Sequence, residues 1–116
     1  MFNYRQLEPN QCEFVAVASV NDIKNGERLF VQIDSDSIVI FNIAGQFFAI
    51  ADVCSHDDGP VGEGDLEGYE VICPRHGAKF DVRSGKVLSL PAIVDIPAYP
   101  VKVEEGEILI GLPSDI

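Results

Sequence analysis

Apolar residues occur along the chain in short runs of alternating or continuous character, which are typical of β-strands rather than helices. Six runs rich in β-branched and aromatic residues are predicted to be strands: residues 14–18, 28–33, 37–43, 46–50, 69–72 and 107–110. Turn-forming residues lie between them at positions 34–36, 44–45 and 104–106. No long apolar repeat of helical period is present, so helix is limited to a turn or two near residues 20–23. The pattern predicts an all-β fold, a small sandwich or barrel.

The middle of the chain has a different composition. Residues 54–91 include six glycines and three prolines, at positions 59, 62, 64, 68, 77 and 85 and at positions 60, 74 and 91. Such residues form tight and stiff turns, so we predict loops rather than strands in this segment, apart from residues 69–72. These loops are expected to stand on the β scaffold with a fixed shape.

Length and composition indicate one domain that covers residues 1–116, with 47% apolar residues to form a core. No apolar run approaches the roughly 20 residues of a membrane-spanning helix, and the first residues lack the pattern of a signal peptide. Three cysteines fit a reducing compartment better than a disulfide framework. We therefore expect a cytoplasmic protein without a membrane anchor.

The chain carries 19 acidic and 8 basic residues, which give a formal net charge of −11. Nucleic-acid binding needs a cationic face, so this balance argues against a nucleic-acid partner. A basic protein partner is more natural for such a surface. Half of the basic residues lie between positions 75 and 86, whereas residues 57–70 are acidic, so these two segments are candidates to pair with each other.

Two short motifs carry the candidate chemistry: Cys54-Ser-His56 and, after sixteen intervening residues, Cys73-Pro-Arg-His76. Together they offer two thiolates and two imidazoles, and they use both histidines of the chain. This ligand set allows an iron–sulfur cluster to bind one iron through sulfur and the other through nitrogen. The motifs therefore indicate a metal centre for electron transfer.

A Cys2His2 zinc site is the main alternative, because zinc accepts the same atoms. Structural zinc motifs usually place two cysteines in one half and two histidines in the other, whereas each half here supplies one of each. The mixed order favours a 2Fe-2S cluster. A zinc-binding interaction domain without redox chemistry remains the alternative from another class.

The two motifs, followed by Gly77, Phe80-Asp81, Ser84-Gly85 and Leu90-Pro91-Ala92, resemble the Rieske iron–sulfur family, and most closely its small soluble bacterial ferredoxins. The resemblance implies an antiparallel β-sandwich or barrel base with an inserted cluster-binding subdomain at about residues 52–92. It implies that Cys54 and Cys73 hold the inner iron of one 2Fe-2S cluster and His56 and His76 the outer, exposed iron. Pro91 is expected in a loop that covers the cluster.

The chain also departs from the respiratory, high-potential branch of this family. That branch has a disulfide between its cluster loops, and this chain has no cysteine for one there. The high-potential branch also has a serine and a tyrosine hydroxyl near the cluster, where this chain has Ala78 and Phe80. Fewer donors to the sulfurs give less stabilisation of the reduced state, so we expect a low potential within the Rieske range. Arg75, between two ligands, is a candidate for docking or tuning.

With both histidines assigned to the cluster, none is left for an oxygen-activating iron centre, and no nucleotide-binding glycine fingerprint is present. Cys12 has no histidine left to activate it as a nucleophile. We therefore expect an electron carrier rather than an enzyme. The carrier would receive electrons from a flavoprotein reductase and, by resemblance, pass them to a terminal non-haem iron oxygenase, as a possible component of a multicomponent dioxygenase. The small Rieske subunit of a nitrite reductase complex is the alternative within redox chemistry.

Overall fold

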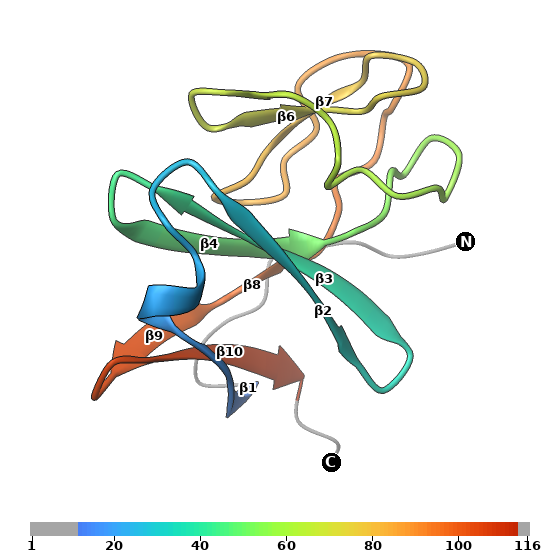
Figure 1. The fold of residues 1–116 in the computed structure, drawn as a ribbon. Coiled ribbons are helices and arrows are strands. Elements are labelled where there is room, and N and C mark those ends of the chain that lie inside the picture. Colours follow the sequence, from blue (N-terminus) through green and yellow to red (C-terminus); the bar gives the residue numbers. More distant parts are fainter. Residues whose placement is uncertain (1–11, 114–116) are drawn as a thin grey trace.

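The computed structural model of the chain describes residues 12–113, which form three antiparallel sheets (Figure 1). The elements are β1 (Cys12–Ser19), the 3-10 helix η2 (Val20–Asp22), β2 (Arg28–Ile33), β3 (Asp36–Ile43), β4 (Gln46–Ala51), β5 (Leu66–Glu67), β6 (Glu70–Ile72), β7 (Lys79–Asp81), β8 (Ala98–Tyr99), β9 (Val101–Glu104) and β10 (Glu107–Pro113). The sheet orders are β1-β10-β9, β2-β3-β4-β8 and β5-β6-β7. No helix among the described residues is long and apolar enough to cross a membrane. The all-β class predicted from the sequence is confirmed.

Two-residue turns close several hairpins, at the positions where the sequence predicted them. Ala44 and Gly45 connect β3 to β4, and Glu105 and Gly106 connect β9 to β10. All four residues have positive φ, which is the geometry of a turn whose twist matches that of the flanking strands. The predicted short helix is also present as η2, and Ser19 caps it through its side chain.

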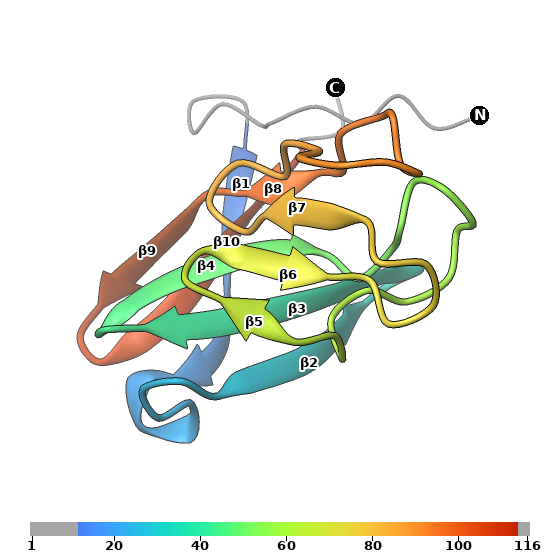
Figure 2. The same cartoon turned by 90° about the horizontal axis from the view of Figure 1, so that it is seen from above.

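Strand β3 lies at the centre of the molecule, between two cores. Its alternate residues Ile38 and Ile40 pack with Ile108 and Ile110 of β10, and the residues between them, Val39 and Phe41, join a second core. A strand covered on both faces has no polar face, and this explains the continuous apolar run of residues 38–41. Figure 2 shows the sheet β5-β6-β7 lying over this central sheet.

The prediction that residues 54–91 are loops was wrong in part. Besides β6, the segment contains the two-residue strand β5 and the three-residue strand β7, and β6 pairs with both. The inward residues of β6 and β7, Val71 and Phe80, are fully buried in the second core. The glycine- and proline-rich segment is therefore a small sheet with long connections, and it rests on the central sheet.

Candidate metal centre

The first ligand turn, residues 54–60, follows β4. The Cys54 amide donates to the carbonyl of Gly59 at 2.7 Å, and the Asp58 amide donates to the carbonyl of Cys54 at 2.7 Å. These two bonds close a tight turn, in which Asp58 has a φ of 61°. Cys54 is fully buried and His56 is exposed, so the turn directs a sulfur inward and an imidazole outward.

The second ligand turn, residues 73–77, connects β6 to β7. The Cys73 amide donates to the carbonyl of Ala78 at 2.7 Å, and the Gly77 amide donates to the carbonyl of Cys73 at 3.0 Å. Gly77 has a φ of 78°, in the left-handed region that favours glycine. Cys73 is buried and His76 is exposed, so this turn repeats the polarity of the first one.

The structure brings the four predicted ligands together as two pairs. Cys54 and Cys73 are neighbours in the second core, close enough for their thiols to interact. The rings of His56 and His76 lie edge to face, with 5.0 Å between their centroids and an interplanar angle of 89°. One end of the site is thus a buried pair of sulfurs and the other an exposed pair of imidazoles.

This arrangement of donors fits a dinuclear cluster. Residues 12–113 contain no group of three or more His, Cys, Asp or Glu side chains that could hold a single metal ion. A Rieske-type cluster requires only two protein ligands on each iron, of one chemical type each. The separation into a sulfur pair and a nitrogen pair meets that requirement.

Cys54 lies in surroundings that act on its thiol in two directions. Burial raises the pKa of Cys54, and this is the largest effect. The backbone amides of His56 and Asp57 donate hydrogen bonds towards its sulfur and lower the pKa in part, whereas the nearby Cys73 raises it further. The same amides are suited to stabilise a sulfur that carries negative charge, as a metal-bound thiolate does.

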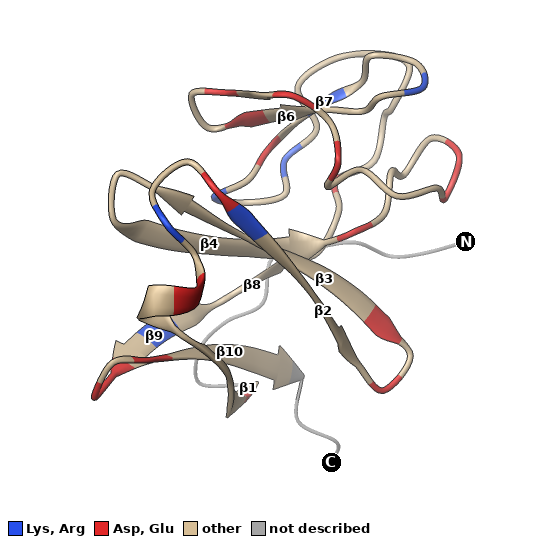
Figure 3. Cartoon of the chain, in the orientation of Figure 1, with Lys and Arg blue, Asp and Glu red and all other residues tan. Residues whose placement is uncertain are grey.

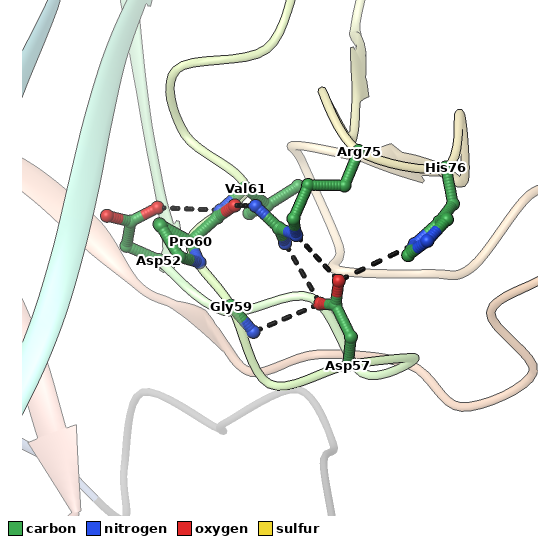
Figure 4. A network of polar contacts seen from close by, with 7 residues as sticks. All are labelled: Asp52, Asp57, Gly59, Pro60, Val61, Arg75 and His76. Carbon is green, nitrogen blue, oxygen red and sulfur yellow. Dashed lines mark hydrogen bonds and ion pairs between the residues drawn. The ribbon is translucent and has the colours of Figure 1, made fainter.

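An ion pair joins the two ligand turns (Figure 4). Arg75 Nε lies 2.6 Å from Asp57 Oδ2, and His76 Nδ1 lies 3.5 Å from the same oxygen. The hydrogen bond from Arg75, followed by that from the Gly59 amide, holds the pKa of Asp57 well below its usual range. Asp57 in turn raises the pKa of Arg75. The pairing of the acidic segment with the basic one, which the sequence suggested, is therefore present at these two residues.

Acidic residues are otherwise spread over several turns and strand ends (Figure 3). Asp52, just before the first ligand turn, accepts hydrogen bonds from the amides of Val61 and Gly62 at 3.0 and 2.6 Å. It thereby fixes the point where the chain leaves that turn. The sequence analysis did not identify Asp52, because a carboxylate that caps backbone amides has no sequence signature of its own.

A third segment, residues 88–95, lies beside the two ligand turns. The Ser55 hydroxyl, within the first turn, donates to the carbonyl of Val94. The Lys79 amide, just after the second turn, donates to Ser89 Oγ at 3.1 Å. Leu90 and Ile93 on this segment are 76% and 77% exposed. Exposed aliphatic residues on a segment beside the ligand turns were not foreseen, because the apolar pattern of a sequence predicts burial.

Comparisons with known proteins agree with this geometry. The family model described as the Rieske [2Fe-2S] domain matches residues 13–100. The ferredoxin subunit of 3-phenylpropionate/cinnamic acid dioxygenase from Escherichia coli K12 is 44% identical over 96 residues, which cover 82% of this chain and 90% of that protein.

Among solved structures, the chain is similar to ferredoxins of oxygenase systems. The ferredoxin of carbazole 1,9a-dioxygenase from Nocardioides aromaticivorans IC177 superposes with a TM-score of 0.79 at 31% identity, covering 84% of this chain and 95% of that one. A second similar chain comes from a complex of reduced oxygenase and oxidised ferredoxin in carbazole 1,9a-dioxygenase. Its TM-score is 0.80 at 29% identity, and the match covers 92% of this chain and 99% of that one.

Proposed function

The chain belongs to the Rieske [2Fe-2S] domain family, and on that premise we propose that it is a ferredoxin, a one-electron carrier between a flavoprotein reductase and a terminal non-haem iron oxygenase. The observation that carries the proposal is the pairing of two buried sulfurs with two exposed imidazoles. The similarity to ferredoxin subunits of dioxygenase systems supports the same role.

Four side chains would hold the cluster, as the resemblance implies: Cys54 and Cys73 the inner iron, and His56 and His76 the outer one. When bound, the 2Fe-2S cluster supplies one reversible electron at a potential that its ligands and surroundings set. The buried cysteines keep one end of the site away from water. The exposed imidazoles bring the other end to the protein surface, where a partner can approach.

The surroundings of the site favour a potential towards the low end of the Rieske range, roughly −150 to +300 mV. Ala78 and Phe80 are both fully buried and provide no hydroxyl. The segment that follows the second ligand turn therefore lacks two hydrogen-bond donors that would stabilise added negative charge. A low potential suits a carrier that supplies reducing electrons to an oxygenase.

Leu90 and Ile93 supply a surface for the acceptor protein. Both are largely exposed and lie on the segment that Ser55 holds beside the first ligand turn. Docking of the terminal oxygenase over them would cover apolar surface and bring its redox centre close to His56 and His76. The complex of an oxygenase with a similar ferredoxin supports an oxygenase as the partner.

The chain itself does not provide a second reaction centre. Its only two histidines form the imidazole pair, so it has no further histidine for an oxygen-activating two-histidine, one-carboxylate iron site. We therefore assign the oxygenation to the partner and the electron transfer to this chain. Its three cysteines form no disulfide, which fits the reducing conditions of the cytoplasm.

Spectroscopy tests the proposal directly. The purified protein should be red-brown, contain two irons and two sulfides, and give on reduction a paramagnetic signal with an average g value below that of all-cysteine clusters. Replacement of one imidazole by a thiolate, in His76→Cys, should lower the potential because it adds negative charge. A colourless protein with one zinc and no sulfide would refute the ferredoxin assignment.

A further inference from the structure

The side chain of Arg75 makes three hydrogen bonds to the first ligand turn (Figure 4). Its Nε donates to Asp57 Oδ2 at 2.6 Å and its Nη2 donates to Asp57 Oδ1 at 2.9 Å. Its Nη1 donates to the carbonyl of Pro60 at 2.7 Å. The guanidinium thus binds a carboxylate through two parallel bonds and a backbone carbonyl through a third, which fixes its orientation as well as its position.

Gly59 shapes the surface on which the guanidinium lies. A Cβ atom at this residue would be 2.7 Å from Arg75 Cζ and 2.8 Å from Nη2, closer than atoms can pack. Its amide also donates to Asp57 Oδ1 at 3.0 Å, so the carboxylate is held from its own turn as well as from the other turn. The absence of a side chain at position 59 is what lets Arg75 approach.

We propose that Asp57, Gly59 and Arg75 form an interloop clasp that positions the imidazoles of His56 and His76 relative to each other. Asp57 follows His56 directly and Arg75 precedes His76 directly, so joining them fixes the two imidazole-bearing backbones. The inference rests on the proposed function, because the imidazole pair is taken as the ligand pair of the outer iron.

Besides these bonds, the two imidazole-bearing turns meet at the edge-to-face contact of the rings and at His76 Nδ1, which lies 3.5 Å from the same Asp57 carboxylate. The backbone hydrogen bonds at Cys54 and Asp58 close within the first turn, and those at Cys73 and Gly77 close within the second. The buried cysteines are held by the core, whereas the histidines lie further out on exposed parts of the turns. The bonds between residues 57 and 75 therefore hold the exposed parts of the two turns, which the core does not contact.

The clasp acts on local geometry rather than on overall stability, because an exposed ion pair adds little to the free energy of folding. Arg75→Gln and Asp57→Asn should each accelerate loss of the cluster to a chelator, followed by visible absorbance, by about tenfold. This factor is the fold-change that corresponds to a typical coupling energy between two residues in contact. Both variants should also change the anisotropy of the electron paramagnetic resonance signal.

The two variants separate the clasp from a plain charge effect. Arg75→Gln removes a positive charge and Asp57→Asn a negative one, so a through-space effect would act on the site with opposite signs. Loss of the clasp acts in the same direction in both, and the double variant should be no worse than either single variant. The charge exchange, D57R with R75D, should restore part of the cluster retention.

Asp81 and Arg83 provide a matched control. They form the same kind of pair, at 2.7 Å, within one turn of the same small sheet, and they do not bridge the ligand turns. Asp81→Asn and Arg83→Gln should leave the rate of cluster loss and the resonance signal unchanged. Equal effects in the two pairs would overturn the proposal.

Gly59→Ala tests the clasp without any change of charge. The added methyl displaces the guanidinium, so this variant should lose its cluster as fast as Arg75→Gln. Gly68→Ala, in the β5–β6 turn, is the control for a glycine substitution in this sheet. No atom lies within 4 Å of the added methyl; the φ of 60° makes this substitution strained, but it leaves the clasp untouched, so the variant should retain the cluster.

If the wild-type protein holds the cluster and the variants at positions 57, 59 and 75 retain it equally well, the clasp is refuted and the proposed function stands. If the wild-type protein binds no 2Fe-2S cluster, both are refuted.

Discussion

Truncation of Leu90 and Ile93 to alanine tests whether the terminal oxygenase docks on the segment that Ser55 holds beside the first ligand turn. Neither residue belongs to a buried core, and they are 76% and 77% exposed. Their truncation should therefore leave the fold and the cluster intact. Only the surface offered to the partner changes.

The expected loss of affinity follows from the exposed area. Each substitution removes three carbons, which are worth about 2.4 kcal/mol when taken fully out of water, at about 0.8 kcal/mol per carbon. Scaling by the exposed fraction of 76% leaves about 1.8 kcal/mol for Leu90, which corresponds to a Kd about twentyfold weaker. Ile93 gives a similar value. The double variant should weaken binding by up to about 400-fold if the partner covers both side chains.

The assay combines binding and electron transfer. Calorimetry gives the Kd for the oxygenase component, and stopped-flow mixing of reduced ferredoxin with oxidised oxygenase gives the second-order rate constant. Val103→Ala is the matched control, because Val103 is an apolar residue with 49% exposure on β9, at the opposite end of the molecule from the ligand turns (Figure 1).

An unchanged Kd in the double variant, at equal reduction potential, would refute docking on this segment. So would an equal loss in Val103→Ala. A loss of binding to the reductase alone would also contradict the assignment of this face to the oxygenase. Because the contact is apolar, the difference between variant and wild type should persist in high salt, where long-range attraction of charges is screened.

Three further predictions concern the site and the fold. Ala78→Ser introduces a hydroxyl beside the second ligand turn. A donor that favours the reduced state by about 1.4 kcal/mol raises the reduction potential by about 60 mV. Potentiometric titration measures this shift, and an unchanged potential would contradict the prediction. Gly85→Ala should destabilise the domain in urea far more than Gly106→Ala. Both residues have positive φ, which costs about 1–2 kcal/mol, but only at Gly85 does the new Cβ meet a backbone oxygen, at 1.9 Å. Arg83 lowers the pKa of Asp81, so this carboxylate stabilises the fold above its unfolded pKa, near about 3.9, and the contribution is lost as the pH falls through the lower folded value. Asp81→Asn should thus reduce the unfolding free energy at pH 7 by less than about 1 kcal/mol, with a difference that disappears in acid; a constant difference would contradict the pairing.

The parts of the fold that the sequence predicted are those with a strong local signal. Strand β2 has the predicted bounds, and the two-residue turns at Ala44 and Glu105 occur where small or polar residues precede glycine. The meeting of the four candidate ligands as a sulfur pair and an imidazole pair was predictable from the two motifs, because few residue types offer the chemistry of cysteine and histidine. The small sheet was largely missed, since strands of two or three residues, such as β5 and β7, are too short to show a period.

Contacts between loops were only partly predictable. The opposite charges of the two segments suggested a pairing, but the choice of Asp57 as the partner of Arg75 depends on the way the turns fold. The need for a glycine at position 59 follows from the packing of that guanidinium. Exposure of Leu90 and Ile93 runs against the usual meaning of apolar residues, and a structure was needed to show it.

The central strand β3 couples cluster binding to the stability of the whole domain. Val39 and Phe41 share a core with Cys54 and Cys73, while Ile38 and Ile40, on the opposite face of the same strand, anchor the rest of the domain. A group that binds only the native turns stabilises the native state by mass action. Because β3 belongs to both cores, we expect this added stability to extend to both of them. The melting temperature of the whole domain should therefore report cluster occupancy.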